Sequence, residues 1–284
     1  MNRKIIWALV GGVTLVGILL GILLSLDFTQ DTIWEELSEA GLAAQEQGRE
    51  AKAQWLLWGS LKVSERFEDH DPRLAKSLND LATVYYVQGR YREAEPLYRR
   101  YLTIAEKRLG SKHPDLVTTL NNLAQTYFIR KKYSDAERLY RRSLAIVEKL
   151  QGSEHLDVTT SLNKLAISYF FQDRYAEAER TLQRSLAIAE KALGPENRQV
   201  AQTLKNLAHT YVKQGKYVEA EPLYQRALAI VEKVRGPEHL DVANTLQTYA
   251  ELLRKMDRGI EAGNMEDRAK RIRDKAGSSS GECC

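Results

Sequence analysis

The sequence holds only two cysteines, Cys283 and Cys284, and they are its last two residues. A fold stapled by disulfides, or a zinc or iron–sulfur site built on thiolates, is therefore excluded for the body of the chain. Only 6 of the 284 residues are proline, so long stretches are free to form helices. The net charge is small, +4 from 42 basic and 38 acidic side chains. Because the two signs are interleaved, no nucleic-acid partner is expected.

Motifs of catalysis are also missing. The chain has no His-Glu-x-x-His pair, no glycine-rich phosphate loop and no nucleophile elbow. Histidines recur at His113, His155 and His239, but each lies in its own connector, whereas a metal needs three or four ligands that converge on one point. We expect these histidines to brace the joints between repeats. The sequence predicts no enzyme, no cofactor, no metal and no small-molecule substrate.

Charge is absent from one long stretch, Ile5 to Leu26, which follows Arg3 and Lys4. As a helix these 22 residues would span about 33 Å, enough for the roughly 30 Å apolar core of a bilayer. The apolar region of a cleaved signal peptide is shorter, so we predict a retained signal anchor that crosses the membrane once. The basic residues before it place residues 1–4 in the cytoplasm and the rest of the chain on the extracytoplasmic side, which is periplasmic in a bacterium. Trp34 is expected at the membrane interface.

One sequence motif recurs along the rest of the chain with a period of 42 residues. Its four full copies share leucine, alanine and tyrosine at the same places and begin at Leu78, Leu120, Leu162 and Leu204. In each copy, apolar residues at steps of three and four form two stripes separated by a short turn, which predicts a pair of antiparallel helices. A glycine is expected to end each second helix, at Gly110, Gly152, Gly194 and Gly236.

The repeat resembles a known signature. Its residues are Leu123, Ala124, Tyr127, Tyr133, Ala136 and Tyr140, and the pattern is similar to that of tetratricopeptide repeats. The usual period of that family is about 34 residues. The longer form, with Ala-Glu-x-Leu-Tyr-x-Arg and a Gly-x-x-His-Pro-Asp joint, resembles the repeats of kinesin light chains. The resemblance implies an all-α, right-handed superhelical solenoid of antiparallel helix hairpins, here preceded by one transmembrane helix.

The predicted organisation follows from these patterns. After the cytoplasmic residues 1–4 and the anchor 5–26 come a short linker, a solenoid and a flexible tail, at 27–34, 35–275 and 276–284. Within the solenoid, full repeats cover 75–242, and degenerate copies cover 35–74 and 243–275. The last copy is rich in charge from Asp267 to Lys275, as a capping repeat should be, since no neighbour covers its outer face.

In the tetratricopeptide family the first helices line a concave groove, and the resemblance assigns its positions in this chain. They are Lys76, Asn79, Asn121, Asn122, Gln125, Ile129, Asn163, Lys164, Ile167, Phe171, Lys205, Asn206, His209 and Lys213. An asparagine amide both donates and accepts, so a ladder of asparagines suits an extended peptide, and in kinesin light chains asparagines at such positions hold cargo peptides. The alternatives are a solvated polar face, or asparagines that bond the neighbouring repeat.

The groove also has a gradient. Apolar Ile129, Ile167 and Phe171 lie at its middle, and Lys164, Lys205 and Lys213 lie towards the far end. This order favours a peptide with a bulky apolar anchor followed by acidic residues. The predicted function is that of a membrane-anchored scaffold that binds protein or peptide partners in its groove. The alternative is an accessory or regulatory subunit of a membrane enzyme or of an envelope assembly complex.

Overall fold

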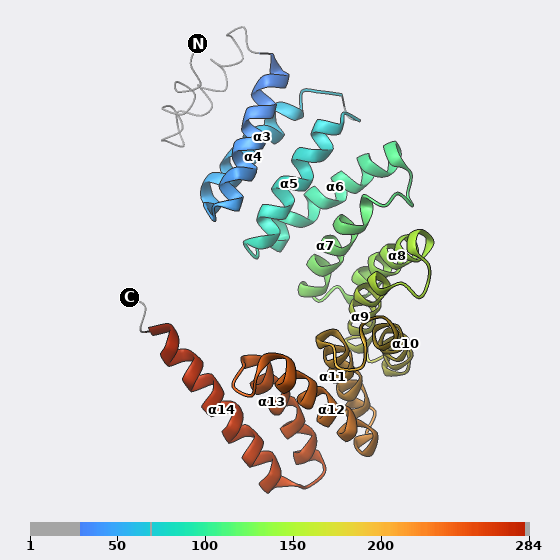
Figure 1. Ribbon diagram of the computed structural model, residues 1–284. Helices are drawn as coiled ribbons and strands as arrows, with labels where there is room; N and C mark the ends of the chain where they lie inside the picture. Colours follow the sequence, from blue (N-terminus) through green and yellow to red (C-terminus); the bar gives the residue numbers. More distant parts are fainter. Residues whose placement is uncertain (1–28, 69, 282–284) are drawn as a thin grey trace. The chain divides into compact units, whose positions relative to one another are not determined.

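The computed structural model describes residues 29–68 and 70–281, and over these ranges the regular structure is helical, without a strand. The helices are α3 (Gln30–Glu46), α4 (Glu50–Ser64), α5 (Pro72–Val87), α6 (Tyr91–Leu109), α7 (Leu116–Ile129), α8 (Tyr133–Gln151), α9 (Leu156–Phe170), α10 (Tyr175–Leu193), α11 (Arg198–Lys213), α12 (Tyr217–Arg235), α13 (Leu240–Lys255) and α14 (Gly259–Gly281) (Figure 1). The all-α prediction is confirmed for this part of the chain.

The predicted membrane anchor, residues 5–26, lies outside the described residues. Among those that are described, no helix combines the length and the apolar character needed to cross a bilayer. Helix α3 begins at Gln30, capped by the Thr29 side chain, and so already occupies part of the stretch expected as a linker. At the other end α14 reaches Gly281, within the stretch expected as a flexible tail.

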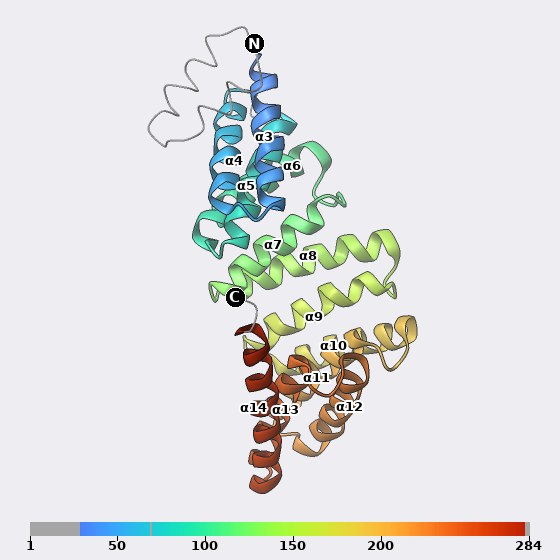
Figure 2. The same cartoon turned by 60° about the vertical axis from the view of Figure 1, so that its left-hand side comes forward.

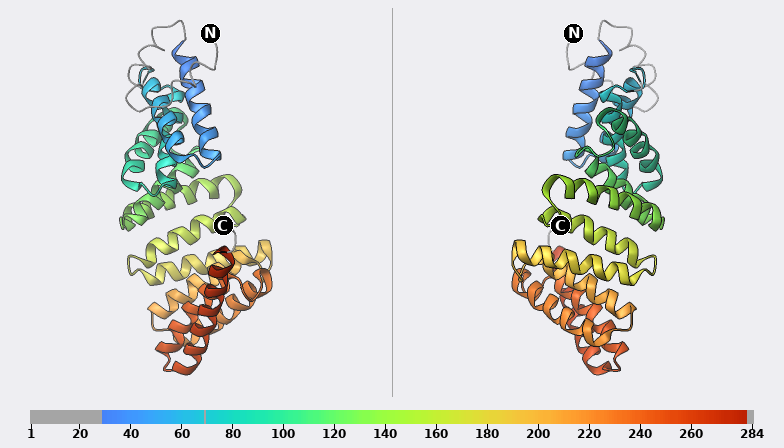
Figure 3. Two further views of the ribbon diagram at one scale, coloured as in Figure 1. Left: turned by 90° about the vertical axis from the view of Figure 1, so that its left-hand side faces the viewer. Right: turned by 90° about the vertical axis from the view of Figure 1, so that its right-hand side faces the viewer.

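The chain divides into two compact units, one that ends at Thr126 and one that begins at Tyr127. In the first unit α3 packs on α4, α4 on α5, and α5 on α6; Figures 1 and 2 both show α3 and α4 side by side. In the second unit each helix from α8 to α14 packs on the next one, and Figure 3 shows α8, α9 and α10 in succession. Within each unit this is the predicted stack of helix hairpins.

The recurring apolar residues form the interior of each hairpin. In α11, Leu204, Leu207 and Ala208 are all buried, and the fully buried Tyr224 of α12 packs beside Ala208. The small Ala208 side chain permits the two helices to approach closely, whereas the Tyr224 ring fills the space between them. Burial of this kind supplies most of the stability of an amphipathic helix. The repeated positions are therefore explained by stacking alone.

The turns use the residues that the sequence indicated. Each second helix from α6 to α12 ends at a glycine with φ between 80° and 94°, a conformation that disfavours a side chain. The joint histidines act as caps on the following helix. Nδ1 accepts from the backbone N–H of the residue two positions on, at 3.3 Å for His113, 3.3 Å for His155 and 3.0 Å for His239. Asn197 does the same through Oδ1 at 2.9 Å, so the predicted bracing role is confirmed.

A ladder of ion pairs ties successive second helices of the second unit together. Glu137, Glu179 and Glu221 each accept from the basic residue at the start of the next second helix. The pairs are Arg174–Glu137 at 2.8 Å, Lys216–Glu179 at 2.9 Å and Arg258–Glu221 at 2.6 Å. The carboxylates are partly or wholly shielded from solvent, so these pairs are screened less than surface pairs.

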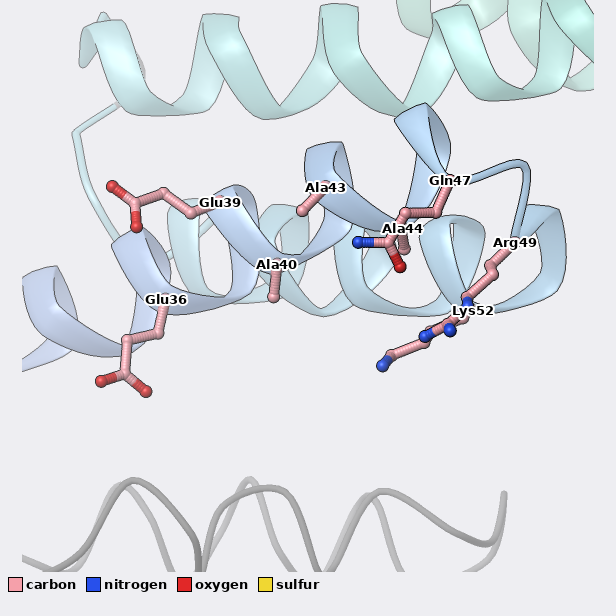
Figure 4. Close-up of a pocket in the computed structure, with 8 residues that line it drawn as sticks. All are labelled: Glu36, Glu39, Ala40, Ala43, Ala44, Gln47, Arg49 and Lys52. Carbon is pink, nitrogen blue, oxygen red and sulfur yellow. The ribbon is translucent and has the colours of Figure 1, made fainter.

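Trp34 lies in the first hairpin. Its indole Nε1 donates to Ser77 Oγ of α5 at 2.7 Å, and Ser77 in turn bonds Ser60 of α4 at 3.0 Å. Trp34 therefore takes part in the packing between α3 and α5, and its expected place at a membrane interface stays a prediction. The first hairpin also has a shallow pocket. Ala40, Ala43 and Ala44 lie at its middle, the acidic Glu36 and Glu39 of α3 lie at one end, and the basic Arg49 and Lys52 lie at the other (Figure 4).

Candidate functional site

The predicted groove asparagines do not share one environment. Asn79 Oδ1 accepts from Thr119 Oγ1 at 2.9 Å. Asn163 Nδ2 donates to Ser185 Oγ at 2.8 Å and lies 3.2 Å from Thr203 Oγ1. Both asparagines thus bond the neighbouring repeat, which is one of the alternatives that the sequence left open.

The other predicted polar positions are mixed. Asn122 Nδ2 donates to Tyr98 OH at 3.4 Å, and Asn206 Oδ1 accepts from Gln202 at 3.1 Å. Lys76 is bonded to Asp80 and Ser38, both at 2.8 Å. On α7, Asn121 and Gln125 are half-buried, and Ile129 is 41% exposed at the end of the helix. At the end of α11, Lys213 is exposed.

A pocket lies between the first helices α9 and α11, with a volume of about 210 Å³. Its lining residues are Ala166, Ile167, Phe170, Phe171, Leu182, Asn206, His209 and Thr210. Four of the predicted groove residues, Ile167, Phe171, Asn206 and His209, meet here. Phe170 and Thr210 were not predicted, because their positions match packing positions in the other repeats. The adjacent pair Phe170-Phe171, which the other copies lack, is the signal that could have identified Phe170.

Aromatic rings hold the pocket's edge in place. Phe171 is 48% exposed, yet its ring stacks on Tyr133 at 5.3 Å and meets Phe128 edge-on at 5.1 Å. Phe170 contacts Phe171 at 5.5 Å and His209 at 4.7 Å between ring centroids. Offset and edge-on contacts of this kind add about 0.5–1.5 kcal/mol each. The exposed ring is therefore held in place by its neighbours.

Basic groups lie on the same first-helix face. Burial lowers the pKa of Lys164, whose ammonium lies 5.9 Å from the Tyr140 ring centroid. Burial likewise lowers the pKa of Lys205, with Asp241 opposing this effect and Arg198 adding to it. Within the ranges that the structure describes, neither lysine forms an ion pair. The lost hydration of the Lys164 ammonium is therefore not compensated by a carboxylate, and that of Lys205 is compensated only in part, by Asp241 without an ion pair.

His209 forms the polar part of the pocket wall. Burial lowers its pKa, and the Lys213 ammonium one turn further along α11 lowers it too, while Glu251 of α13 opposes both. The neutral imidazole is therefore favoured. The described part of the chain contains no cluster of three or more histidine, cysteine or acidic side chains that could hold a metal ion.

Comparison with known families matches the tetratricopeptide repeat over residues 36–107, 74–149, 115–191, 157–220 and 199–275. No curated protein matches the chain. Among solved structures, one is of a protein assigned as a kinesin light chain from Podosopora anserina, whose TPR-like repeats are nearly identical to one another. Its sequence is 27% identical to this chain, and the two structures superpose with a TM-score of 0.62. That match covers 71% of this chain and 96% of the other, and it confirms the resemblance to kinesin-light-chain repeats.

Two further structures share the fold alone. BtubC (BKLC) from P. vanneervenii is 24% identical with a TM-score of 0.63, covering 88% of this chain and 93% of that one. PilF from Pseudomonas aeruginosa is 18% identical with a TM-score of 0.56, covering 86% of this chain and 93% of its own. The helix-hairpin architecture is therefore common to proteins with little sequence in common.

Proposed function

Because the chain belongs to the tetratricopeptide repeat family, we propose that it is a protein-interaction scaffold that binds a peptide segment on the face of its first helices. The observation that carries this proposal is the pocket between α9 and α11, together with Lys164 and Lys205 on the same two helices, which form no ion pair in the described part of the chain. Repeat families of this architecture act by presenting extended binding surfaces. The proposal assigns the chain no catalytic step.

The pocket is suited to an apolar anchor side chain. Its floor and edge are formed by Ile167, Phe170, Phe171 and Leu182, and its volume of about 210 Å³ is sufficient for one large aliphatic or aromatic group. Covering apolar surface contributes about 25 cal/mol per Å². Because the ring of Phe171 is already fixed by its neighbours, little side-chain entropy is lost when a ligand packs on it.

The lysines are suited to an acidic flank. Lys164 and Lys205 lie on α9 and α11, the helices that form the pocket, and both are partly shielded from water. A carboxylate brought by the ligand would favour their charged forms and form charge-assisted hydrogen bonds. The ligand class is therefore a peptide with a bulky apolar residue followed by acidic residues.

The test is a binding assay with synthetic peptides. Peptides that differ only in the anchor (Trp, Leu or Ala) and in the flank (Glu or Gln) are titrated against the full chain by fluorescence anisotropy. Phe171→Ala should abolish the preference for Trp, and Lys164→Gln combined with Lys205→Gln should abolish the preference for Glu. Lys270→Gln, on the exposed surface of α14, is the matched control for lost charge. Equal binding of the Glu and Gln peptides by the unaltered chain would refute the acidic part of the proposal.

We also propose that residues 5–26 anchor the scaffold in a membrane, with the N-terminus in the cytoplasm and the repeats on the extracytoplasmic side, periplasmic in a bacterium. The support is the long uncharged stretch and the basic residues before it. Since α3 begins at Gln30, the repeats would start within a few residues of the bilayer. A reporter that is active on one side only, fused to the C-terminus, tests this orientation. Activity on the cytoplasmic side would overturn it.

A further inference from the structure

One position of the repeat, which lines the pocket on α9 and α11, is apolar in one repeat and titratable in the next two. At steps of 42 residues it reads Ile167, His209 and Glu251, from α9 to α11 to α13. Ile167 and His209 both line the pocket, whereas Glu251 acts on His209 from the next first helix. A titratable group thus occupies a position that is aliphatic in the preceding repeat.

His209 is an exposed residue whose imidazole packs on the apolar part of the pocket lining. Its ring lies 4.7 Å from that of Phe170, with 51° between the ring planes. Among the groups of α9 around the pocket, Phe170 is the one in ring contact with it, and it carries no charge. Two charged groups act on His209: Lys213 on its own helix, which disfavours a second positive charge, and Glu251 on α13, which favours one.

We propose that His209 is a proton-operated gate on this pocket: the neutral imidazole forms a wall on which the partner's apolar anchor packs, and protonation releases the anchor. This inference rests on the proposed peptide-binding function and names the regulation of the same site. The ligand group it concerns is an uncharged apolar side chain.

The mechanism is one of hydration. An apolar side chain that enters the pocket removes water from the face of the imidazole. The neutral ring tolerates this loss because it still packs on Phe170. An imidazolium loses hydration, and Glu251, which favours its charge, forms no ion pair with it in the described part of the chain. Binding of the anchor and binding of the proton therefore oppose each other, and by linkage each weakens the other to the same extent.

The gate would act in an ordinary range of acidity. Histidine titrates between about pH 5 and pH 8, and burial together with Lys213 lowers the pKa of His209 from its ordinary value, whereas Glu251 opposes this. At neutral pH the pocket is thus open to an apolar anchor. On acidification the affinity falls, by about tenfold for each pH unit that separates the midpoints of His209 with and without ligand.

The experiment uses a probe without titratable groups. The amidated peptide Gly-Gln-Trp-Gln-Gly, whose α-amine is acylated by a rhodamine dye with fluorescence that does not change over this range, is titrated against the full chain in detergent by anisotropy at about pH 8 and about pH 5. The dissociation constant should rise at the lower pH, by about twofold or more, because protonation of the free His209 competes with binding of the anchor. His209→Phe should bind the peptide equally at both pH values. His239→Asn keeps a capping side chain, as Asn197 shows, and should retain the full pH dependence.

Each outcome decides. Equal binding by the unaltered chain at the two pH values overturns the gate and leaves the pocket proposal standing. Unchanged pH dependence in His209→Phe overturns the assignment to this residue. No binding at either pH overturns the anchor pocket itself, and the gate with it. As an independent readout, NMR titration of the His209 ring carbon should show a lower midpoint in the presence of the peptide, with no change at His155.

Discussion

Helices α5 and α9 carry versions of the same repeat, yet their polar side chains have different tasks. On α5, Lys76 is paired with Asp80 and bonded to Ser38, and its ammonium lies 5.7 Å from the Trp34 ring. On α9, Lys164 is half-buried with no acidic partner among the described residues. The first lysine is satisfied inside the protein, whereas the second has capacity for a ligand.

The same contrast separates the aromatic residues. Tyr98, Tyr140 and Tyr224, which occupy equivalent positions in three repeats, are fully buried, but Phe171 remains half exposed although three rings contact it. A residue that the stack requires is found by its repetition. A residue that serves a ligand is found by the interactions it does not complete within the chain.

The largest expected effect is on stability, and it tests the difference between a buried and an exposed ring. Tyr140 is 1% exposed in α8, so Tyr140→Ala should lower the free energy of unfolding by about 3–5 kcal/mol. Phe171→Ala should cost less, about 1.5–3 kcal/mol, since half of its surface is already in water and its loss removes three ring contacts, but it should abolish binding of a Trp-anchored peptide. Urea unfolding followed by circular dichroism, beside the anisotropy assay, measures both. A loss of stability in Phe171→Ala as large as in Tyr140→Ala would remove the distinction.

The next effect concerns the asparagines. Asn163→Ala removes bonds to Ser185 and Thr203 and should cost about 1–3 kcal/mol, because buried hydroxyls lose a partner. Asn206→Ala loses a bond to the exposed Gln202 on its own helix and should be nearly neutral for stability. The two variants form a matched pair in urea unfolding. If Asn163→Ala unfolds like the unaltered chain, its amide does not brace the joint.

The joint histidines are expected to matter at about 1 kcal/mol. His155→Ala removes the acceptor for the Asp157 N–H at the start of α9, and loss of such a cap costs about 0.5–2 kcal/mol. His155→Asn should restore most of this, because Asn197 caps α11 in the same way. Thermal unfolding of the two variants at pH 7.5 tests the assignment. A His155→Asn variant as unstable as His155→Ala would show that the cap bond is not the reason for the histidine.

The smallest effect has the opposite sign. Lys164→Met should raise stability by about 0.5–1 kcal/mol at neutral pH, because burial disfavours the charged amine. Since its pKa in the folded chain is lowered, the gain should shrink as the pH rises towards the ordinary lysine value of 10.5, above which both states are uncharged. Lys76→Met, which loses an ion pair, should show no such gain. Stabilisation should come with a loss of affinity for acidic peptides.

Repetition made the hairpins predictable, because Leu204 and Ala208 of α11, and Ala220 and Tyr224 of α12, recur at helical spacing and are buried together. The glycine ends were equally predictable from their spacing. The groove was predicted less well. Sequence places Asn79 and Asn163 on the right face, but it cannot say that their amides turn towards Thr119 and Thr203, since that depends on side chains 40 positions away.

The pocket shows the same limit. Ile167, Phe171, Asn206 and His209 were assigned separately to the groove, and the structure brings them to one place. Phe170 was missed because its position reads as packing in the other copies. Whether the Phe170 ring is buried or lines a pocket depends on the residue that the next repeat places against it. In this chain that residue is His209 of α11.

The ladder Glu137–Arg174, Glu179–Lys216 and Glu221–Arg258 has a consequence for how such a chain can change in length. Arginine and lysine both meet the same carboxylate of the preceding hairpin, so any hairpin of this type offers its successor a compatible contact. A duplication or deletion of one 42-residue copy among these hairpins would therefore leave each of these joints with a basic residue opposite a carboxylate. The ion pairs between successive second helices are equivalent, so the face of the first helices can gain or lose one binding subsite while the contacts between hairpins stay the same.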